Sequence, residues 1–211
     1  MIYRNDVALQ TAGYLLQIKA VKLSPKNLFI WASGIQSPIY CDNSVTLSFP
    51  EIRTFIKDQF AAAIREKIRK PDLIAGVATG GIAQGALVAQ ELDLPFAYVR
   101  TSKKEHGLTN QIEGTVLPGQ SVVVVEDLIS TGKSSLEVVA ALREAGCIIQ
   151  GMVAIFTYNL PIAEKGFSDG NCLLVTLSDY DILVKKALEI KYITEEDLKV
   201  LQEFKQMLAN K

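Results

Sequence analysis

Five short apolar runs alternate with helical segments through most of this 211-residue chain. The runs lie at residues 73–78, 95–99, 121–125, 148–157 and 173–177. Runs of this kind are typical of parallel strands that are buried on both faces and joined by crossover helices. The sequence therefore predicts an α/β fold with a roughly five-stranded parallel sheet flanked by helices. Ligands bind such sheets beyond the carboxyl ends of the strands, so function is expected in the loops that follow the runs.

The chain has no internal repeat, low-complexity tract or Pro/Gly/Ser-rich linker, which predicts a single domain over residues 1–211. Within it we expect an N-terminal hood, a core and a C-terminal helix, at about 1–48, 49–190 and 194–210. Periodic apolar residues predict further helices at 6–20, 52–68, 82–92 and 133–144. Ser48 with Glu51, and Thr194 with Asp197, have the spacing of capping boxes at helix starts.

Positive and negative charges nearly balance, since 22 Lys and Arg face 23 Asp and Glu for a net charge of −1. A general binder of nucleic acids or membrane surfaces would have a basic excess, so neither partner is expected. No run approaches the ~18 apolar residues of a membrane span, and the N-terminus lacks the apolar stretch of a signal peptide. Cys41, Cys147 and Cys172 are far apart, which favours reduced thiols over disulfides or a zinc site. These features predict a cytoplasmic enzyme.

The valine run 122–125 is followed by Glu126-Asp127 and then by a Ser130-Thr131-Gly132 turn that leads into a helix. Backbone N–H groups at a helix N-terminus, beside small hydroxyl residues, form a site for a phosphate. The two acids precede the turn by three residues, where they have no capping purpose. Adjacent carboxylates in that place suit the cis-diol of a sugar.

This segment has two other possible interpretations. Gly132-Lys133-Ser134 matches the end of a Walker A motif, but that motif requires glycine where the chain has Asp127, whose charge would repel a nucleotide phosphate. An ordinary capped helix start also favours Ser, Thr and Asp. That interpretation leaves the pair Glu126-Asp127 unexplained.

Four apolar residues, two acids, two aliphatic residues and Ser-Thr-Gly resemble the signature of type I phosphoribosyltransferases, which bind phosphoribosyl pyrophosphate (PRPP). The resemblance implies a type I phosphoribosyltransferase-like fold, in which Glu126 and Asp127 hold the ribose 2′- and 3′-hydroxyls. It implies that Ser130–Ser134 wrap the 5′-phosphate. The PRPP-binding residues in this segment are then Glu126, Asp127, Leu128, Ile129, Ser130, Thr131, Gly132, Lys133 and Ser134.

A polar stretch from Arg100 to Gly119 contains Lys103, Lys104 and the only histidine, His106. A long loop inside a compact domain is usually functional, although a solvated surface loop is the ordinary alternative. Arg100, three residues, Lys104-x-His106-Gly107 and then residues 110–114 resemble the catalytic loop of orotate phosphoribosyltransferases. The resemblance implies that Arg100, Lys104 and His106 contact the leaving pyrophosphate, and that Lys104, His106 and Asp127 are catalytic.

Two further segments carry the same resemblance. Residues 76–81, with Thr79 and Gly80 as PRPP-binding residues, resemble the pyrophosphate loop. Residues 33–40, a Gly- and Pro-containing turn between the segments 29–31 and 39–41, resemble the base-binding segment.

The chain departs from some members of the family at two places. It has Thr101 where some carry a second basic residue, and Phe156–Asn159 where some have an arginine that binds the carboxylate of orotate. That carboxylate then needs other partners: backbone N–H groups near Tyr40 and Cys41, the Ser130 hydroxyl, or Lys22.

The resemblance covers roughly residues 5–190 and implies transfer of ribose 5-phosphate from PRPP to orotate in pyrimidine (UMP) biosynthesis. It also implies Mg²⁺ bound mainly through PRPP, with no certain protein ligand, and a homodimer in which the lid loop of one subunit covers the partner's site. A phosphoribosyltransferase for another base and a non-catalytic PRPP-sensing regulator are the alternative functions.

Overall fold

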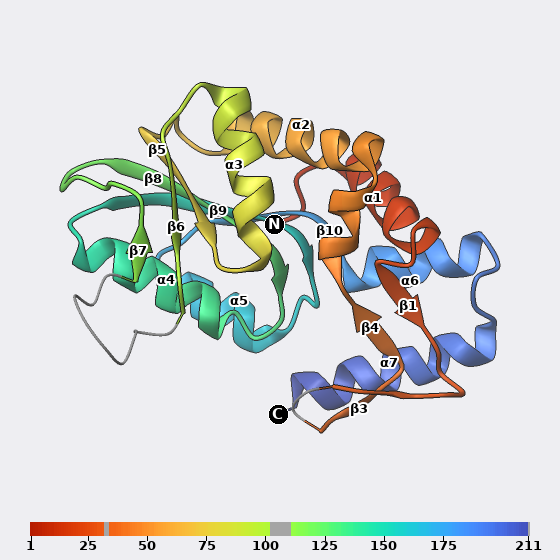
Figure 1. Ribbon diagram of the computed structural model, residues 1–211. Coiled ribbons are helices and arrows are strands. Elements are labelled where there is room, and N and C mark those ends of the chain that lie inside the picture. The colour runs from red at the N-terminus through yellow and green to blue at the C-terminus, as the bar shows by residue number, and fades with distance from the viewer. Residues whose placement is uncertain (32–33, 102–110, 211) are drawn as a thin grey trace.

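The computed structural model describes residues 1–31, 34–101 and 111–210. Its centre is a six-stranded sheet in the order β10-β9-β8-β5-β6-β7 (Figure 1). The strands are β5 (Leu73–Val77), β6 (Phe96–Val99), β7 (Ile112–Glu113), β8 (Ser121–Ile129), β9 (Ile148–Thr157) and β10 (Leu174–Asp179). The five strands other than β7 are mutually parallel, which confirms the predicted core. The antiparallel strand β7 lies inside the polar stretch, where no apolar run indicated it.

Helices cover both faces of the sheet. They are α1 (Asn5–Gln17), α2 (Pro50–Lys67), α3 (Gly80–Leu92), α4 (Lys133–Glu144), α5 (Pro161–Asp169), α6 (Tyr180–Glu189) and α7 (Glu195–Ala209). Helices α2 and α3 lie on one face, and α4 and α5 lie on the other (Figure 1). Helices α5 and α6 had no sequence prediction, whereas the other five lie where periodicity or capping placed them.

The valines of β8 show why its sequence has no polar alternation. Val123 and Val125 belong to the apolar core on the α2–α3 side, and Val122 and Val124 belong to the core on the α4–α5 side. All four are fully buried, and each contributes on the order of 1.5–3 kcal/mol relative to an exposed side chain. The strand is therefore fixed from both faces, and so are the residues that follow the valines.

Residues 21–41, within the predicted N-terminal hood, form two small antiparallel sheets. Strand β1 (Val21–Leu23) pairs with β4 (Ile39–Cys41), and β2 (Phe29–Ile30) pairs with β3 (Gln36–Ser37). The segments around the predicted turn therefore do not pair with each other, because the second of them pairs with β1. Helix α7 lies beside these strands (Figure 1).

One of the two predicted capping boxes is present. At α7, the backbone N–H of Thr194 donates to Asp197 at 3.0 Å, and the backbone N–H of Asp197 donates to the Thr194 hydroxyl at 3.3 Å. The box predicted at Ser48 and Glu51 is wrong. Ser48 ends a 3₁₀ helix (η1, Asn43–Ser48), so α2 begins one residue later, with Phe49 at its N-cap and no side-chain cap.

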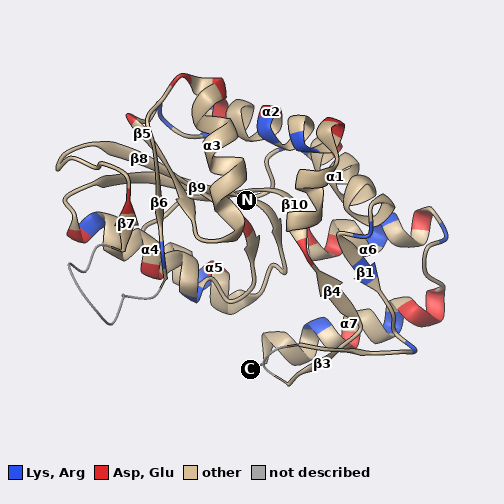
Figure 2. Ribbon diagram, viewed as in Figure 1, with Lys and Arg blue, Asp and Glu red and all other residues tan. Residues whose placement is uncertain are grey.

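Acidic and basic residues are interspersed over the helices, and the central strands carry little charge (Figure 2). Within the described ranges, no helix has the length and hydropathy that a membrane crossing requires.

Candidate active site

Strand β8 carries the two adjacent acids within its last residues. The prediction that a loop begins after Val125 is wrong, because β8 stays paired with β9 through Glu126, Leu128 and Ile129. The backbone N–H of Tyr158 then donates to the carbonyl of Ile129 at 3.0 Å. Strand β9 has 10 residues against the 9 of β8 and supplies partners this far, so the sheet itself positions both carboxylates.

The Glu126 side chain is 5% exposed and accepts two hydrogen bonds from the protein. Its Oε2 accepts from the Ser135 hydroxyl at 2.9 Å, and its Oε1 accepts from the backbone N–H of Asp127 at 3.0 Å. Burial, together with the adjacent negative charge of Asp127, raises the pKa of Glu126 to about 9. The environment therefore favours the neutral form of this carboxyl at neutral pH.

Asp127 lies against the loop between β5 and α3. A Cβ added to Gly80 would come within 2.2 Å of Asp127 Oδ1, so only glycine permits this approach. The carbonyl of Asp127 accepts from Asn43 Nδ2 at 2.7 Å, which links it to η1 as well. The structure thus brings Asp127 of β8 against Gly80 at the start of α3, next to the N-cap residue Thr79.

The phosphate loop (residues 130–134) leads from β8 into α4. Gly132 is the N-cap residue and has a left-handed backbone, with φ +78°, which favours glycine. No side chain caps the N-terminus of α4, where the helix dipole and the first N–H groups favour an anion.

An aromatic cavity of about 420 Å³ lies between the hood and the core. It is lined by Ile30, Trp31, Tyr40, Cys41, Leu128, Ser130 and Tyr158, and no charged side chain is among them. Its volume falls in the usual range for small-molecule sites, about 300–1,000 Å³. Tyr40, Cys41 and Ser130 of the predicted base-binding residues line it. Lys22 does not line it, and its Nζ lies 6.0 Å from the centre of the Tyr40 ring.

Two lining residues hold acidic groups in their neutral forms. Burial raises the pKa of the Tyr158 hydroxyl well above its ordinary value. Burial, with the nearby charges of Asp127 and Asp42, does the same for the pKa of the Cys41 thiol. The lining therefore provides hydrogen-bonding groups without charge, and Cys41 has no tendency to act as a thiolate nucleophile.

Comparisons with known proteins agree with this geometry. Residues 50–176 match the sequence model of the family described as "Phosphoribosyl transferase domain". The chain is 54% identical to the orotate phosphoribosyltransferase of Phocaeicola vulgatus over 194 residues, 92% of either chain. It is also 54% identical to that of Streptococcus pneumoniae serotype 4 over 204 residues, 97% of either chain. The chain belongs to the orotate phosphoribosyltransferase family.

The fold agrees with this family. The crystal structure of orotate phosphoribosyltransferase from Aeropyrum pernix has a TM-score of 0.74 at 26% identity, and the match covers 87% of this chain and 99% of that one. The predicted family and the predicted fold are thus confirmed.

The base of the polar stretch lies at the edge of the sheet in this family member. Arg100 forms an ion pair with Glu113, and its backbone N–H donates to the carbonyl of Gln111 at 2.9 Å. The Nε of Arg100 is buried without a hydrogen-bond partner in the described part of the chain. The two lid residues predicted to be catalytic, Lys104 and His106, lie outside the described residues.

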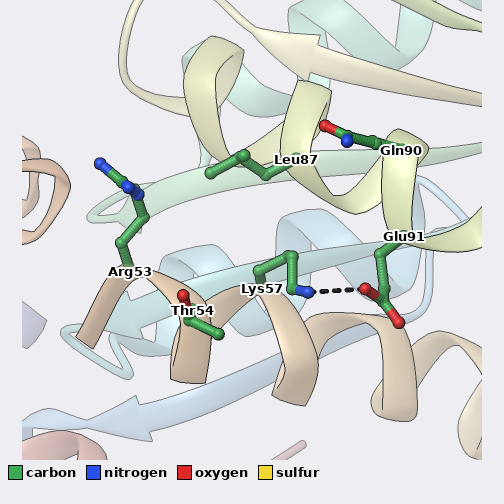
Figure 3. Close-up of a pocket in the computed structure, with 6 residues that line it drawn as sticks. All are labelled: Arg53, Thr54, Lys57, Leu87, Gln90 and Glu91. Carbon is green, nitrogen blue, oxygen red and sulfur yellow. Dashed lines mark hydrogen bonds and ion pairs between the residues drawn. The ribbon is translucent and has the colours of Figure 1, made fainter. Parts of the chain in front are cut away.

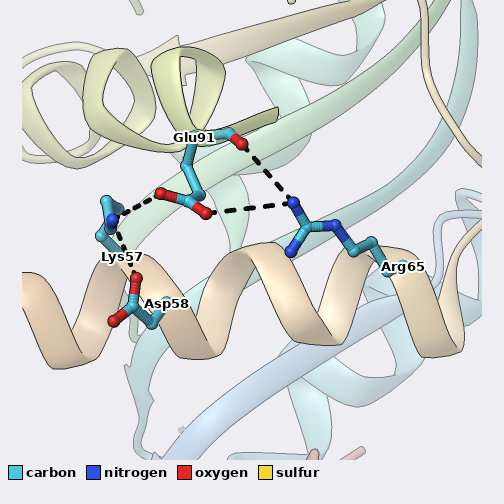
Figure 4. A network of polar contacts seen from close by, with 4 residues as sticks. All are labelled: Lys57, Asp58, Arg65 and Glu91. Atoms are coloured by element: carbon cyan, nitrogen blue, oxygen red, sulfur yellow. Dashed lines mark hydrogen bonds and ion pairs between the residues drawn. The ribbon is translucent and has the colours of Figure 1, made fainter. Parts of the chain in front are cut away.

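A second hollow, of about 330 Å³, lies between α2 and α3 (Figure 3). It is lined by Arg53, Thr54, Lys57, Leu87, Gln90 and Glu91, none of which was predicted to belong to the site. Lys57 bridges Asp58 and Glu91 at 2.8 and 2.6 Å, and Arg65 also contacts Glu91 (Figure 4). Surface ion pairs of this kind contribute about 0–1 kcal/mol each, and they connect two helices.

Sequence reasoning missed much of the aromatic cavity. Trp31 and Tyr158 were noticed only as neighbours of other features, and Ile30 and Leu128 were not assigned to the base. No local pattern relates these residues, because they come from β2, β8 and the segments that follow β2 and β9. The aromatic residues near the turn at 33–38 were the one available signal.

Proposed function

We propose that this chain transfers ribose 5-phosphate from PRPP to orotate, giving orotidine 5′-phosphate and pyrophosphate in pyrimidine biosynthesis. The observation that supports this most directly is the position of Ser130. It belongs to the phosphate loop and also lines the aromatic cavity. A sugar phosphate bound at the end of β8 therefore has a base-sized cavity directly beside it.

In this proposal, Glu126 and Asp127 contact the ribose hydroxyls, and residues 130–134 surround the 5′-phosphate. Thr79 and Gly80, which adjoin Asp127, contact the pyrophosphate. As the bond from the anomeric carbon to pyrophosphate breaks, positive charge develops on the sugar and negative charge on the leaving group. Arg100, with Lys104 and His106, stabilises the leaving group. Positioning and fixed charges lower the barrier, because the pyrimidine nitrogen needs little activation.

Magnesium fits this arrangement as an ion that arrives with PRPP. In the described ranges, no group of three or more His, Cys, Asp or Glu residues could hold a metal ion. Mg²⁺ usually keeps several waters and binds through substrate phosphates and one or two carboxylates. When bound, it would neutralise charge on the pyrophosphate, and no protein residue is assigned to it.

The aromatic cavity would take the orotate ring. Its uncharged lining suits a flat heterocycle, and the Ser130 hydroxyl and the backbone near Tyr40 and Cys41 are the nearest candidates for the carboxylate. Lys22 is the cationic candidate, but it does not line the cavity and would have to move toward it from the Tyr40 ring.

A homodimer with shared lids, in the cytoplasm, belongs to the same proposal. The stretch that contains Lys104 and His106 begins after β6 and ends at β7, at one edge of the sheet. Strand β5 separates β6 from β8. The lid thus begins two strands away from the acids it is proposed to serve, which supports action on a neighbouring subunit.

The test is the loss of orotate absorbance in the presence of PRPP and Mg²⁺. Hypoxanthine, adenine and uracil are tested as alternative bases. Of these bases, we expect only orotate to be turned over. Preference for another base would mean that the chain is a phosphoribosyltransferase for that base. PRPP binding without turnover of any base would favour the regulator.

A further inference from the structure

We propose that helix α7 forms part of the base site, with Phe204 as a positioning residue that holds Trp31 in the wall of the aromatic cavity. The inference rests on the proposed function, in which that cavity takes orotate. Phe204 does not line the cavity itself. It acts through the tryptophan ring.

Trp31 is fixed at three points. Its Nε1 donates to the carbonyl of Ile39 at 3.0 Å. Its ring makes an edge contact with Tyr158, with centroids 5.6 Å apart, and a second edge contact with Phe204 at 5.8 Å and 89°. Tyr158 lines the same cavity, whereas Phe204 comes from the C-terminal helix.

Trp31 belongs to a short hairpin, in which its backbone N–H donates to the carbonyl of Ile35 at 2.9 Å and its carbonyl accepts from the N–H of Gly34 at 2.8 Å. Strand β2, which precedes it, has two residues and pairs only with the two-residue strand β3. Isolated two-stranded hairpins are marginally stable in water, and the neighbouring Ile30 is 73% exposed. The orientation of the indole therefore depends on the Ile39 carbonyl within the hood and on side chains outside it. Among the described residues, Phe204 is one of two rings that touch the indole.

Helix α7 is also connected to Tyr158, a second aromatic residue that lines the cavity. The Tyr180 hydroxyl donates to the carbonyl of Leu201 on α7 at 2.9 Å, and the Tyr180 ring lies 6.0 Å from the Tyr158 ring. Contacts thus run from Phe204 to Trp31, Tyr158 and Tyr180 and return to α7 at Leu201. This closed series ties Trp31 and Tyr158, two rings that line the cavity, to one helix.

The helix is well anchored for this role. A capping box fixes its N-terminus, and Lys205 Nζ contacts Asp181 Oδ2 of α6 at 2.6 Å. Phe204 is 7% exposed, so its ring is buried. The position of its helix is fixed by the capping box and by the Lys205–Asp181 ion pair, which do not involve Phe204. A change at Phe204 should consequently alter the cavity wall more than it alters the phosphate loop.

The experiment uses Trp31 as the reporter, because it is the only tryptophan in the chain. Phe204→Leu removes the ring contact, and Phe204→Tyr retains it. Leu201→Val is the matched control, because it trims a buried side chain of the same helix and keeps the carbonyl that Tyr180 uses. Steady-state kinetics, melting temperature and Trp31 emission, corrected for orotate absorbance, are measured for each.

We expect Phe204→Leu to raise KM for orotate on the order of 3- to 10-fold, the range given by loss of one aromatic pair. KM for PRPP and kcat stay near wild type, Trp31 emission shifts to the red, and the midpoint of quenching by orotate rises with KM. Phe204→Tyr behaves as wild type, and Leu201→Val lowers the melting temperature without a selective change in orotate KM. If Phe204→Leu is too unstable to assay, Phe204→Met keeps the apolar volume without the ring.

The proposal is overturned if Phe204→Leu leaves orotate KM and Trp31 emission unchanged, or if both substrates' KM values rise together as they would through general loosening. Failure of the proposed function is a different result: wild-type protein would neither consume orotate nor show quenching by it. Trp31 emission in Phe204→Leu still decides in that case, since an unchanged spectrum means that α7 does not set the cavity wall.

Discussion

The two halves of the proposed site are built in different ways. The proposed contacts to the ribose and the 5′-phosphate come from one continuous segment, 126–134, placed against Gly80 by a contact that leaves no room for a Cβ. The aromatic cavity is assembled from four separate segments of the chain, and a fifth, α7, supports it through Phe204. One half thus depends on backbone geometry within a strand and a helix start, and the other depends on packing between distant side chains.

This difference leads to different responses to mutation. Fixed groups at the end of a buried strand have no alternative arrangement, so their loss should stop the reaction. Packed aromatic rings can readjust, so substitutions in the aromatic cavity should weaken orotate binding by moderate amounts that depend on the substitution. Mutations of the proposed site test that contrast.

Asp127→Asn should reduce turnover on the order of 10²-fold or more, as loss of one preorganised group at a reacting centre commonly does. The melting temperature should stay within a few degrees of wild type, because Asp127 caps no helix and its carbonyl contact to Asn43 remains. Activity and thermal unfolding are measured on the same preparation. If the variant unfolds and its residual activity follows the folded fraction, Asp127 is structural and the contrast fails.

Lys104→Ala should lower turnover by on the order of 10²-fold or more for the same electrostatic reason, with a smaller change in PRPP affinity. Single-turnover kinetics and PRPP binding separate the two effects. Near wild-type turnover would mean that the polar stretch after Arg100 is not the lid.

Shared lids would make the PRPP half depend on two subunits. Inactive Lys104→Ala and Asp127→Asn proteins are mixed and allowed to exchange subunits. If the lid acts on the partner, each hybrid dimer has one intact site of two, so activity returns to about a quarter of wild type at equal mixing. The quarter follows because random exchange makes half of the dimers hybrid. Verified hybrids that remain inactive would show that the lid acts within its own subunit.

Ser135→Ala should lower kcat/KM for PRPP on the order of 5- to 30-fold, which corresponds to about 1–2 kcal/mol for a buried acceptor left without its donor. The Ser135 hydroxyl bonds to Glu126 across the phosphate loop, at 2.9 Å, so its loss loosens the loop that lies between them. KM for orotate should change little, and Ser135→Thr, which keeps the hydroxyl, should recover most of the loss. If Ser135→Ala impairs the use of PRPP and of orotate equally, Ser135 does not act on the PRPP half alone.

The contrast also explains how much could be predicted from the sequence. The strand-turn-helix of residues 122–144 could be predicted because every determinant is local: the valines, the two acids, Gly132 and the apolar period of α4. The extension of β8 to Ile129 could not, because it depends on pairing with β9 twenty-five or more residues later. The capping box at Ser48 failed for a local reason, because Ser48 is the last residue of η1.

The aromatic cavity could be predicted only in part. Tyr40, Cys41 and Ser130 were named from their segments, but the contact between Trp31 and Phe204 joins residues at opposite ends of the chain. Apolar and aromatic residues at helical spacing look alike whether they fill a core or support a ligand site. Only their arrangement in space separates the two roles.

The smallest expected effect concerns pH and again singles out the PRPP half. The pKa of Glu126 in the folded protein is raised from 4.5 to about 9, by burial first and by Asp127 second. The folded state therefore binds a proton that the unfolded state releases, so this contribution to stability is fully present below about pH 4.5 and is lost as pH rises toward 9. Glu126→Gln cannot ionise, so its melting temperature should gain on wild type as pH is raised from 5 to 9.

Asp127→Asn provides the control for this pH effect, because it removes the second cause of the raised pKa and should flatten the pH dependence only in part. Thermal unfolding across this pH range, without ligands, measures all three proteins. Parallel curves for wild type and Glu126→Gln would mean that Glu126 is ionised in the folded protein at neutral pH. The end of β8 would then present two negative charges before any substrate binds, and a cation that arrives with PRPP would have to neutralise both.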